Sequence, residues 1–232
     1  MSKKLTKNKK SIKKIVDIIH SKKYSLEDAL SILKKVSFVK FDESLDISVN
    51  LGINYKSSKE IIMGTVFLPH STGKKVRILA FVSKDKESAC MNAGADYVGM
   101  NYIEKIKSGW TDIDIIVTMP SIMNKLVVLG KILGPKGLIP NVKMDTISIV
   151  PENIIKEIKS GRIFFKMDKF GIIHSSVGRI SFSNAYLSDN IKEFMKKIIR
   201  SKPNNSKGTY LKSIFLSTTM SCSVSIDTKS FF

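Results

Sequence analysis

The sequence has few of the residues on which many functional sites depend. Its 232 residues include only 2 cysteines and 3 histidines. Cys90 and Cys222 cannot form a disulfide framework and belong to no Cys-x-x-Cys pair, which favours a reducing compartment. His20, His70 and His174 lie in separate segments without the spacing of metal ligands, so we predict neither a metal nor a cofactor. Each histidine is expected to be a hydrogen-bonded turn or strand residue.

Long apolar runs are also missing. No segment approaches the ~18 to 20 apolar residues that a membrane-spanning helix needs, and we predict no membrane partner. The basic N-terminus, MSKKLTKNKKSIKK, has no apolar core of the kind that a secretory signal carries. An organellar transit peptide is the alternative, but such peptides are usually rich in arginine. We therefore expect a mature cytoplasmic start.

Acidic residues are scarce relative to basic ones. The chain has 39 Lys and Arg against 20 Asp and Glu, a net charge of +19. Such a field concentrates polyanions, so nucleic acid is the most favoured partner. Only Arg77, Arg162, Arg179 and Arg200 are arginine, which favours point-charge contacts to phosphate over bidentate base recognition. Residues 66–159 hold 13 basic and 9 acidic residues, while the rest of the chain holds 26 basic and 11 acidic residues. The two ends of the chain are therefore expected to bind the polyanion. The alternative is that the lysines serve only solubility.

Both ends of the chain have the periodicity of helices and half-buried strands. Helical spacing predicts helices over 12–19 and 26–36, the second with Ser25 as its N-cap. Strict alternation predicts a strand over 45–51. Similar patterns near the C-terminus predict strands at 162–168, 171–178 and 208–220 and a helix at 187–198.

The middle of the chain differs because its strands are apolar throughout. Such strands with helices between them are typical of parallel strands covered on both faces. We therefore predict an α+β discontinuous terminal domain, residues 1–65 and 160–232, with an inserted α/β Rossmann-like three-layer domain, residues 66–159. The inserted elements are expected as strands at 76–82, 95–99 and 112–119 and helices at 85–93, 101–108, 120–130 and from Pro151 to Gly161.

No segment has a catalytic pattern. The glycine-rich stretch LGKILGPKGLIPN, residues 129–141, lacks the spacing of a phosphate-binding loop, and Pro135 and Pro140 remove amides that such a loop would use. The stretch PHSTGK, residues 69–74, lacks the earlier glycine because Leu68 holds that place. We therefore predict no enzymatic activity. A nucleotide-dependent enzyme built on the inserted domain is the alternative from another functional class.

Six segments in order along the chain have motifs that match one known family. They are KFDESLDISVNLGI (40–53), GTVFLPHSTGKKVRILAF (64–81), AGADYVG (93–99), LGKILGPKGLIPN (129–141), IKSGRIFFKMDKFGIIHSSVG (158–178) and KGTYLKSIFLSTTM (207–220). Together they resemble the family of the bacterial large-subunit ribosomal protein number one, or L-one. The resemblance implies the same discontinuous fold and a structural role in the ribosome, where the protein and a segment of large-subunit rRNA form a mobile side stalk. It also implies movement with deacylated tRNA leaving the E site, and repression through its own mRNA.

The resemblance also implies contact residues. Ser213 and Thr219 have the same parity, so both face one side of the sheet, where a hydroxyl can pair with a ribose 2′-OH. A core position for Phe41 and an ordinary strand role for Thr219 are the alternatives. The implied hinge lies near Gly64, Pro69, Ser160 and Gly161. The implied rRNA contacts are Lys40, Phe41, Lys166, Asp168, Lys169, Gly171, His174, Ser213, Thr219 and Met220.

The chain departs from the family pattern at several of these segments. Ser221, Cys222 and Ser223 follow Met220 where the family usually has Gly-Pro and a small residue, and glycine permits close approach of backbone to RNA. Met63 replaces a usual basic residue, and Lys166 a common arginine. We expect these changes to affect affinity and autoregulation more than the fold.

Overall fold

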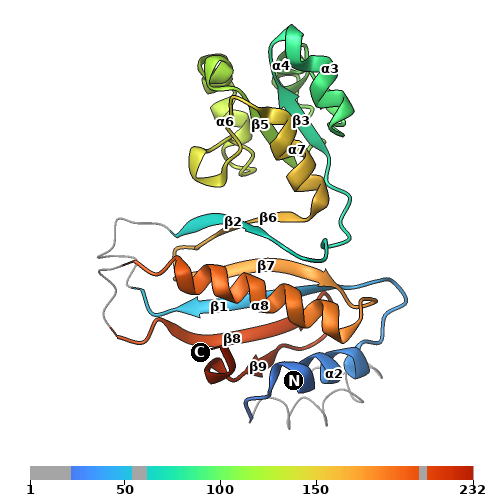
Figure 1. The fold of residues 1–232 in the computed structure, drawn as a ribbon, viewed down its shortest axis with the longest axis vertical. Coiled ribbons are helices and arrows are strands. Elements are labelled where there is room, and N and C mark those ends of the chain that lie inside the picture. Colours follow the sequence, from blue (N-terminus) through green and yellow to red (C-terminus); the bar gives the residue numbers. More distant parts are fainter. Residues whose placement is uncertain (1–21, 54–61, 204–207, 232) are drawn as a thin grey trace, which may run out of the picture. The chain divides into compact units, whose positions relative to one another are not determined.

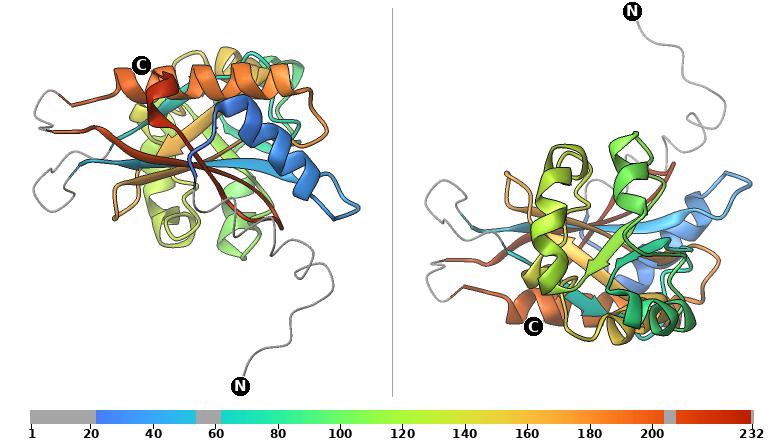
Figure 2. Two further views of the ribbon diagram at one scale, coloured as in Figure 1. Left: turned by 90° about the horizontal axis from the view of Figure 1, so that it is seen from below. Right: turned by 90° about the horizontal axis from the view of Figure 1, so that it is seen from above.

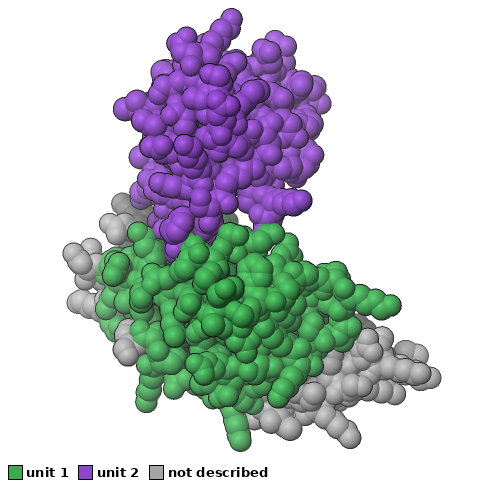
Figure 3. Space-filling model, turned by 45° about the vertical axis from the view of Figure 1, so that its right-hand side comes forward, with its two compact units in different colours: residues 1–62, 68–73, 165–232 green, residues 63–67, 74–164 purple. Residues whose placement is uncertain are grey.

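A computed structural model describes residues 22–53, 62–203 and 208–231. The chain divides into two compact units, coloured separately in Figure 3. Unit 1 comprises Met1–Ile62, Leu68–Gly73 and Phe165–Phe232, and unit 2 comprises Met63–Phe67 and Lys74–Phe164. Both units combine helices with strands, so the predicted mixed α/β character is confirmed. The predicted helix at 12–19 lies outside the described residues.

Unit 1 contains a four-stranded antiparallel sheet. Its strands run in the order β7 (Ile172–Arg179), β1 (Ser44–Leu51), β8 (Leu211–Thr218) and β9 (Val224–Ile226) (Figure 1). Along β1 every second residue is buried, as the alternation predicts. The register sets Ser48 opposite His174 on β7 and Phe215 on β8. Segments more than 120 residues apart in the sequence therefore share one sheet.

Two amphipathic helices cover one face of this sheet. Figure 2 shows α2 (Leu26–Val36) and α8 (Asn184–Arg200) on the same side of the strands. Ser25 caps α2 by accepting a hydrogen bond from the Asp28 amide at 3.2 Å, which confirms its predicted role. The core between these helices and the sheet includes Leu30, Leu33, Ile47, Val49, Ile191, Phe194, Ile214 and Leu216.

The sheet of unit 2 is parallel and covered on both faces. β3 (Ile78–Phe81) lies between β4 (Tyr97–Val98) and β5 (Ile115–Thr118), and all four of its residues are buried. On one face, α3 (Lys84–Asn92) and α7 (Pro151–Ser160) pack against Ile78 and Ala80. On the other, α4 (Tyr102–Lys107) and the helical turns after β5 pack against Leu79 and Phe81. The expectation of parallel strands covered on both faces is confirmed.

Some predicted boundaries are wrong. The segment expected as a helix at 120–130 is helical, but it alternates short 3-10 and α-helical turns, and its three β-branched residues and Gly130 weaken a regular α-helix. The strand expected at 208–220 is shortened at both ends to β8, and Gly208, with φ +86°, lies outside the extended region. The strand expected at 112–119 is shortened to β5. The short turns are η1 (Pro120–Ile122), α5 (Met123–Leu126), η2 (Val127–Leu129) and α6 (Gly130–Leu133), and two further turns are η3 (Val142–Met144) and η4 (Thr228–Phe231).

A separate two-stranded sheet joins β2 (Met63–Phe67) and β6 (Arg162–Lys166). Gly64 lies within β2, Ser160 is the last residue of α7, and Gly161 lies between α7 and β6. Pro151 occupies the first turn of α7, and Gly161 ends it with φ +126°, as predicted. None of the helices within the described ranges has the length and apolar character needed to cross a membrane.

Candidate nucleic-acid interface

The face of the unit 1 sheet that α2 and α8 leave uncovered is polar. On β1 the buried residues Leu45, Ile47 and Val49 face the helices, so the residues between them face away. The register places residues of β7 and β8 beside them. We name this surface the open face; its members are Ser44, Asp46, Ser48 and Asn50 of β1, Ile172, His174 and Ser176 of β7, and Ser213, Phe215 and Ser217 of β8.

Four of the predicted contact residues lie at the Ser44 end of β1. The Thr219 hydroxyl accepts a hydrogen bond from the Ser44 amide at 3.2 Å. The amide of Met220, the residue after Thr219, donates to the Glu43 carboxylate at 2.8 Å. These bonds join the end of β8 to the segment that contains Lys40 and Phe41. Phe41 is 54% exposed and Met220 57%, so the alternative of a core position for Phe41 is wrong.

The turn between β6 and β7 forms the other end of the surface. Asp168 accepts hydrogen bonds from the Phe170 and Ile172 amides, both at 2.8 Å. Gly171 has φ +80°, and its carbonyl accepts from the Leu51 amide at the end of β1 at 2.8 Å. The backbone here adopts the left-handed conformation, which glycine accepts without steric cost. Lys166 and Lys169 flank this turn with exposed side chains.

His174 connects this turn to the open face. Its Nδ1 lies 3.0 Å from the Ser48 hydroxyl, and its Nε2 lies 3.9 Å from the Asp168 carboxylate. The imidazole side chain is 60% exposed. Ser213 lies one strand away, opposite Asn50. The ten predicted contacts therefore form two groups, one at the Ser44 end of β1 and one that extends from His174, opposite Ser48, to the other end. The whole strand spans about 23 Å if each of its seven steps rises about 3.3 Å.

The open face contains one partly buried carboxyl. Burial raises the pKa of Asp46, and this outweighs the Ser176 hydrogen bond and the charge of Arg179, which lower it. The lysines around the face, Lys40, Lys166, Lys169 and Lys212, all have exposed side chains. Hydroxyls within a lysine border suit a ligand that offers both 2′-OH groups and phosphates.

Sequence reasoning missed the middle of this surface. The alternation of β1 already places Ser44, Asp46 and Ser48 on one face, so these three could have been found. Ser217 shares the parity of Ser213, and Ser176 that of His174, but their place beside β1 depends on pairing register across long sequence separations.

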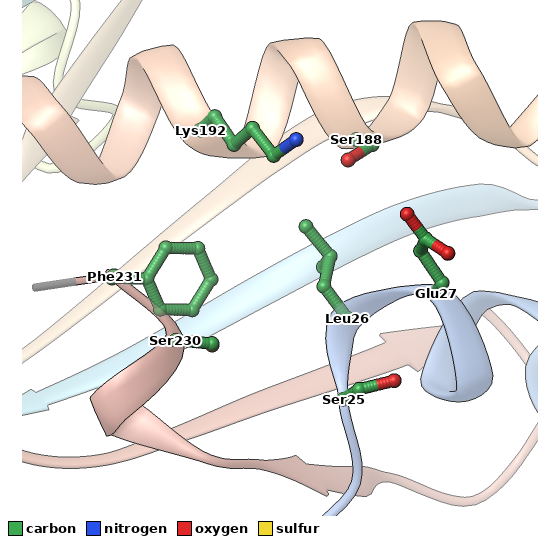
Figure 4. Close-up of a pocket in the computed structure, with 7 residues that line it drawn as sticks. All are labelled: Ser25, Leu26, Glu27, Ser188, Lys192, Ser230 and Phe231. Carbon is green, nitrogen blue, oxygen red and sulfur yellow. The ribbon is translucent and has the colours of Figure 1, made fainter.

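A pocket in unit 1 lies away from the open face. It is a cavity of about 230 Å³ between α2, α8 and η4 (Figure 4). Glu27 and Lys192 are its charged residues, and Leu26 and Phe231 supply apolar surface. Within the described ranges, no group of three or more His, Cys, Asp or Glu could hold a metal ion. The open face is therefore the better candidate site.

Comparison with known proteins identifies the family. A family model described as "Ribosomal protein L1p/L10e family" matches residues 33–222. The chain is 51% identical over 228 residues to "Large ribosomal subunit protein uL1" of Bacteroides thetaiotaomicron, covering 98% of this chain and 97% of that protein. It is 48% identical over 230 residues to the protein of the same name from Porphyromonas gingivalis, covering 99% and 98%. The chain belongs to the Ribosomal protein L1p/L10e family. These relatives are ribosomal proteins, so the prediction that the chain is not an enzyme is confirmed.

Proposed function

We propose that this protein is a cytoplasmic structural constituent of the large ribosomal subunit that binds large-subunit rRNA through the open face of unit 1. The observation that carries the proposal is the uncovered sheet face, whose hydroxyl-bearing strands are bordered by lysines. Half-exposed serines there can pair with ribose 2′-OH groups, and the lysines can neutralise phosphates. Phe41 and Met220, both more than half exposed, offer apolar surface for an unstacked base.

The two groups of contact residues suit RNA recognition by shape. Their separation along β1 requires a ligand that extends over the sheet or meets it at two places. Folded RNA provides such a surface, whereas a mononucleotide does not. The residues proposed as contacts are the ten named from the resemblance, together with Ser48 and Ser217 from the open face.

The test is the salt dependence of binding to a side-stalk rRNA fragment. For each phosphate neutralised, log Kd should rise by roughly 0.7 to 0.9 per log unit of salt. The combined change Lys40→Gln, Lys166→Gln and Lys169→Gln should weaken binding and lower this slope by about 2 to 3. Lys192→Gln, Lys196→Gln and Lys197→Gln make the matched control, because these exposed lysines belong to α8 on the covered side. Equal effects of both triples would contradict the proposal.

We assign rRNA binding to a discontinuous domain, 1–65 and 160–232, and a mobile role to the inserted domain, 66–159. The division of the chain into two compact units supports this assignment. The proposed hinge comprises Gly64, Pro69, Ser160 and Gly161. Gly64 and Pro69 lie beside the unit boundaries at 62/63 and 67/68, and Ser160 and Gly161 lie shortly before the boundary at 164/165. A moving inserted domain accounts for assistance in releasing deacylated tRNA from the E site. Ribosomes carrying only residues 1–65 joined to 160–232 should release that tRNA more slowly.

Repression of its own mRNA is proposed as a second use of the same surface. An mRNA that imitates the rRNA site would meet the same hydroxyls and lysines. Ser221, Cys222 and Ser223 lie directly after Met220, so they adjoin this contact. A reporter fused to the protein's own mRNA leader should be repressed when the protein is supplied in excess, and repression should fail with Thr219→Val. Unchanged reporter output would contradict this second role.

A further inference from the structure

We infer that Glu43 is a positioning residue for RNA binding: its buried carboxylate fixes the segments that present Phe41 and Met220 to the ligand. The inference rests on the proposed function. Glu43 has an exposed fraction of 0%, although it lies two residues after Phe41, which is 54% exposed. A charged side chain is costly to bury, and burial is tolerated when its oxygens accept hydrogen bonds.

Both carboxylate oxygens of Glu43 have partners, and the partners come from different segments. One oxygen accepts from the Ser37 hydroxyl at 2.6 Å, immediately after α2. The other accepts from the Met220 amide at 2.8 Å, just beyond β8. The backbone carbonyl of Glu43 accepts from the Ile180 amide at 2.9 Å, at the end of β7. One residue therefore ties together three segments of unit 1.

The neighbouring residue reinforces these ties. The Asp42 carboxylate accepts from the Ser181 amide at 3.2 Å and from the Ser181 hydroxyl at 2.9 Å. Arg179 donates to the Asp42 carbonyl at 3.1 Å. The segment that carries Lys40 and Phe41 is thus held on both sides before any ligand arrives. A surface fixed in advance loses less conformational entropy on binding.

The burial of Glu43 also accounts for an acidic residue so close to a polyanion site. An exposed carboxylate here would repel phosphate, whereas one inside the protein, with both oxygens bonded, does not meet the ligand. Glu43 contributes order to the surface without contacting RNA. Its loss should change binding through the positions of Thr219 and Met220, and not through a lost contact.

The experiment compares RNA affinity, thermal stability and amide chemical shifts among variants of the full chain. Glu43→Ala leaves the Met220 amide and Ser37 hydroxyl unpaired, so we expect affinity for the side-stalk rRNA fragment to fall about tenfold or more. Glu43→Gln retains an acceptor for Met220 and a group that can bond Ser37, so it should rescue affinity to within about threefold. The Thr219 and Met220 amide signals should shift in Glu43→Ala and return in Glu43→Gln.

Asn190→Ala is the matched control. Asn190 is also 0% exposed, and its side chain makes three hydrogen bonds to the backbones of His70 and Val177, none of them with Ser37, Ile180 or Met220, the three residues that Glu43 bonds. It should lower Tm without changing affinity or the Met220 signal. If Glu43→Ala does not fold, Glu43→Asp, whose shorter side chain cannot reach both partners, replaces it with an expected loss of about threefold or more.

The outcomes separate the two ideas. If the wild-type chain does not bind the rRNA fragment, the proposed function fails. If the wild-type chain binds and a folded Glu43→Ala binds equally well, only the positioning role fails. Equal losses of affinity in Glu43→Ala and Asn190→Ala would also overturn it, because both would then act through general stability.

Discussion

The two sheets of this molecule differ in how many of their faces are buried. In unit 1, β1 alternates buried and half-exposed residues, and helices cover one face only. In unit 2, all four residues of β3 are buried, and helices cover both faces. An alternating strand leaves a polar face free for a ligand, whereas an apolar strand uses both faces for the core. The comparison explains why the candidate interface lies on the sheet of unit 1.

Substitutions of adjacent residues in β3 and in β1 give the largest expected change in stability. Ile78→Ala and Leu79→Ala should each destabilise unit 2 by about 2 to 5 kcal/mol, because each removes buried volume on one of the two covered faces. Of the adjacent residues Ile47 and Ser48 in β1, only Ile47→Ala should have this effect, while Ser48→Ala should cost below about 1 kcal/mol. Hydrogen exchange of peptides from each unit measures these changes. A large cost for Ser48→Ala would break the comparison.

Thr219→Val tests the open face at its Ser44 end. The valine leaves the Ser44 amide without its side-chain acceptor and removes a hydroxyl from the surface. We expect a loss of about 1 to 3 kcal/mol in RNA binding, measured as a Kd ratio. Thr219→Ser keeps the hydroxyl and is the control, with affinity close to wild type. Equal binding by Val and Ser variants would return Thr219 to the role of an ordinary strand residue.

The carboxyls of the two units should respond to pH with opposite sign. In unit 2, burial alone would raise the pKa of Asp96, but hydrogen bonds from Lys159 and the Ile78 amide outweigh it and lower that pKa. Its contribution to stability is therefore present above the unfolded pKa near 3.9 and is lost as pH falls through the lower folded value. Asp96→Asn should remove this acid-range loss, as followed by fluorescence of the chain's single Trp, Trp110, which lies in unit 2.

The partly buried carboxyl of the open face gives the contrasting case. Burial raises the pKa of Asp46, so its charged form is unfavourable in the folded state. This cost is present at neutral pH and is relieved as pH falls through the raised folded pKa. Asp46→Asn should therefore stabilise unit 1 slightly at pH 7, and less so near pH 4. Lower stability of Asp46→Asn than of the wild type at pH 7 would contradict the raised pKa of Asp46.

Ser221 offers the smallest expected effect. Within the part of the chain that the structure describes, its buried hydroxyl has no hydrogen-bond partner. Ser221→Ala should then stabilise unit 1 by about 1 kcal/mol, since an unsatisfied buried polar group is costly. Ser221→Gly, which introduces the glycine that the resemblance implies at this position, should strengthen RNA binding. Calorimetry measures the stability of Ser221→Ala, and a Kd measurement gives the RNA affinity of Ser221→Gly. Lower stability of the first variant together with weaker binding by the second would contradict this expectation.

Much of the fold could be predicted because local patterns carry it. The alternation at 45–51, the Ser25 cap and the Gly161 helix end depend on nearby residues only, and all three are confirmed. The apolar spacing at 120–130 predicts a helix, and the segment is helical, but its composition favours alternating 3-10 and α turns over one regular helix. Helix length depends on competition among weak propensities, which periodicity does not measure.

The candidate site was predictable only in part. The resemblance supplied residues at both ends of β1, and the alternation of β1 predicts the face of Ser48, whereas the placement of Ser176 and Ser217 beside it depends on the register of β7 and β8. The exposure of Phe41 could not be read from the sequence, since an aromatic residue before a strand is equally compatible with a core position. The burial of Glu43 gave no sequence signal either, because its partners at 37, 180 and 220 are distant or on loops.

Hydroxyl-radical footprinting of the protein, with and without the side-stalk rRNA fragment, tests the central claim most directly. Phe41 and Met220 belong to the proposed interface and are 54% and 57% exposed, while Tyr186 on α8 and Met91 on α3 are 50% and 60% exposed and serve as internal references. The account predicts that RNA protects Phe41 and Met220 from oxidation and leaves Tyr186 and Met91 unchanged. Protection of Tyr186 with continued oxidation of Phe41 and Met220 would contradict it.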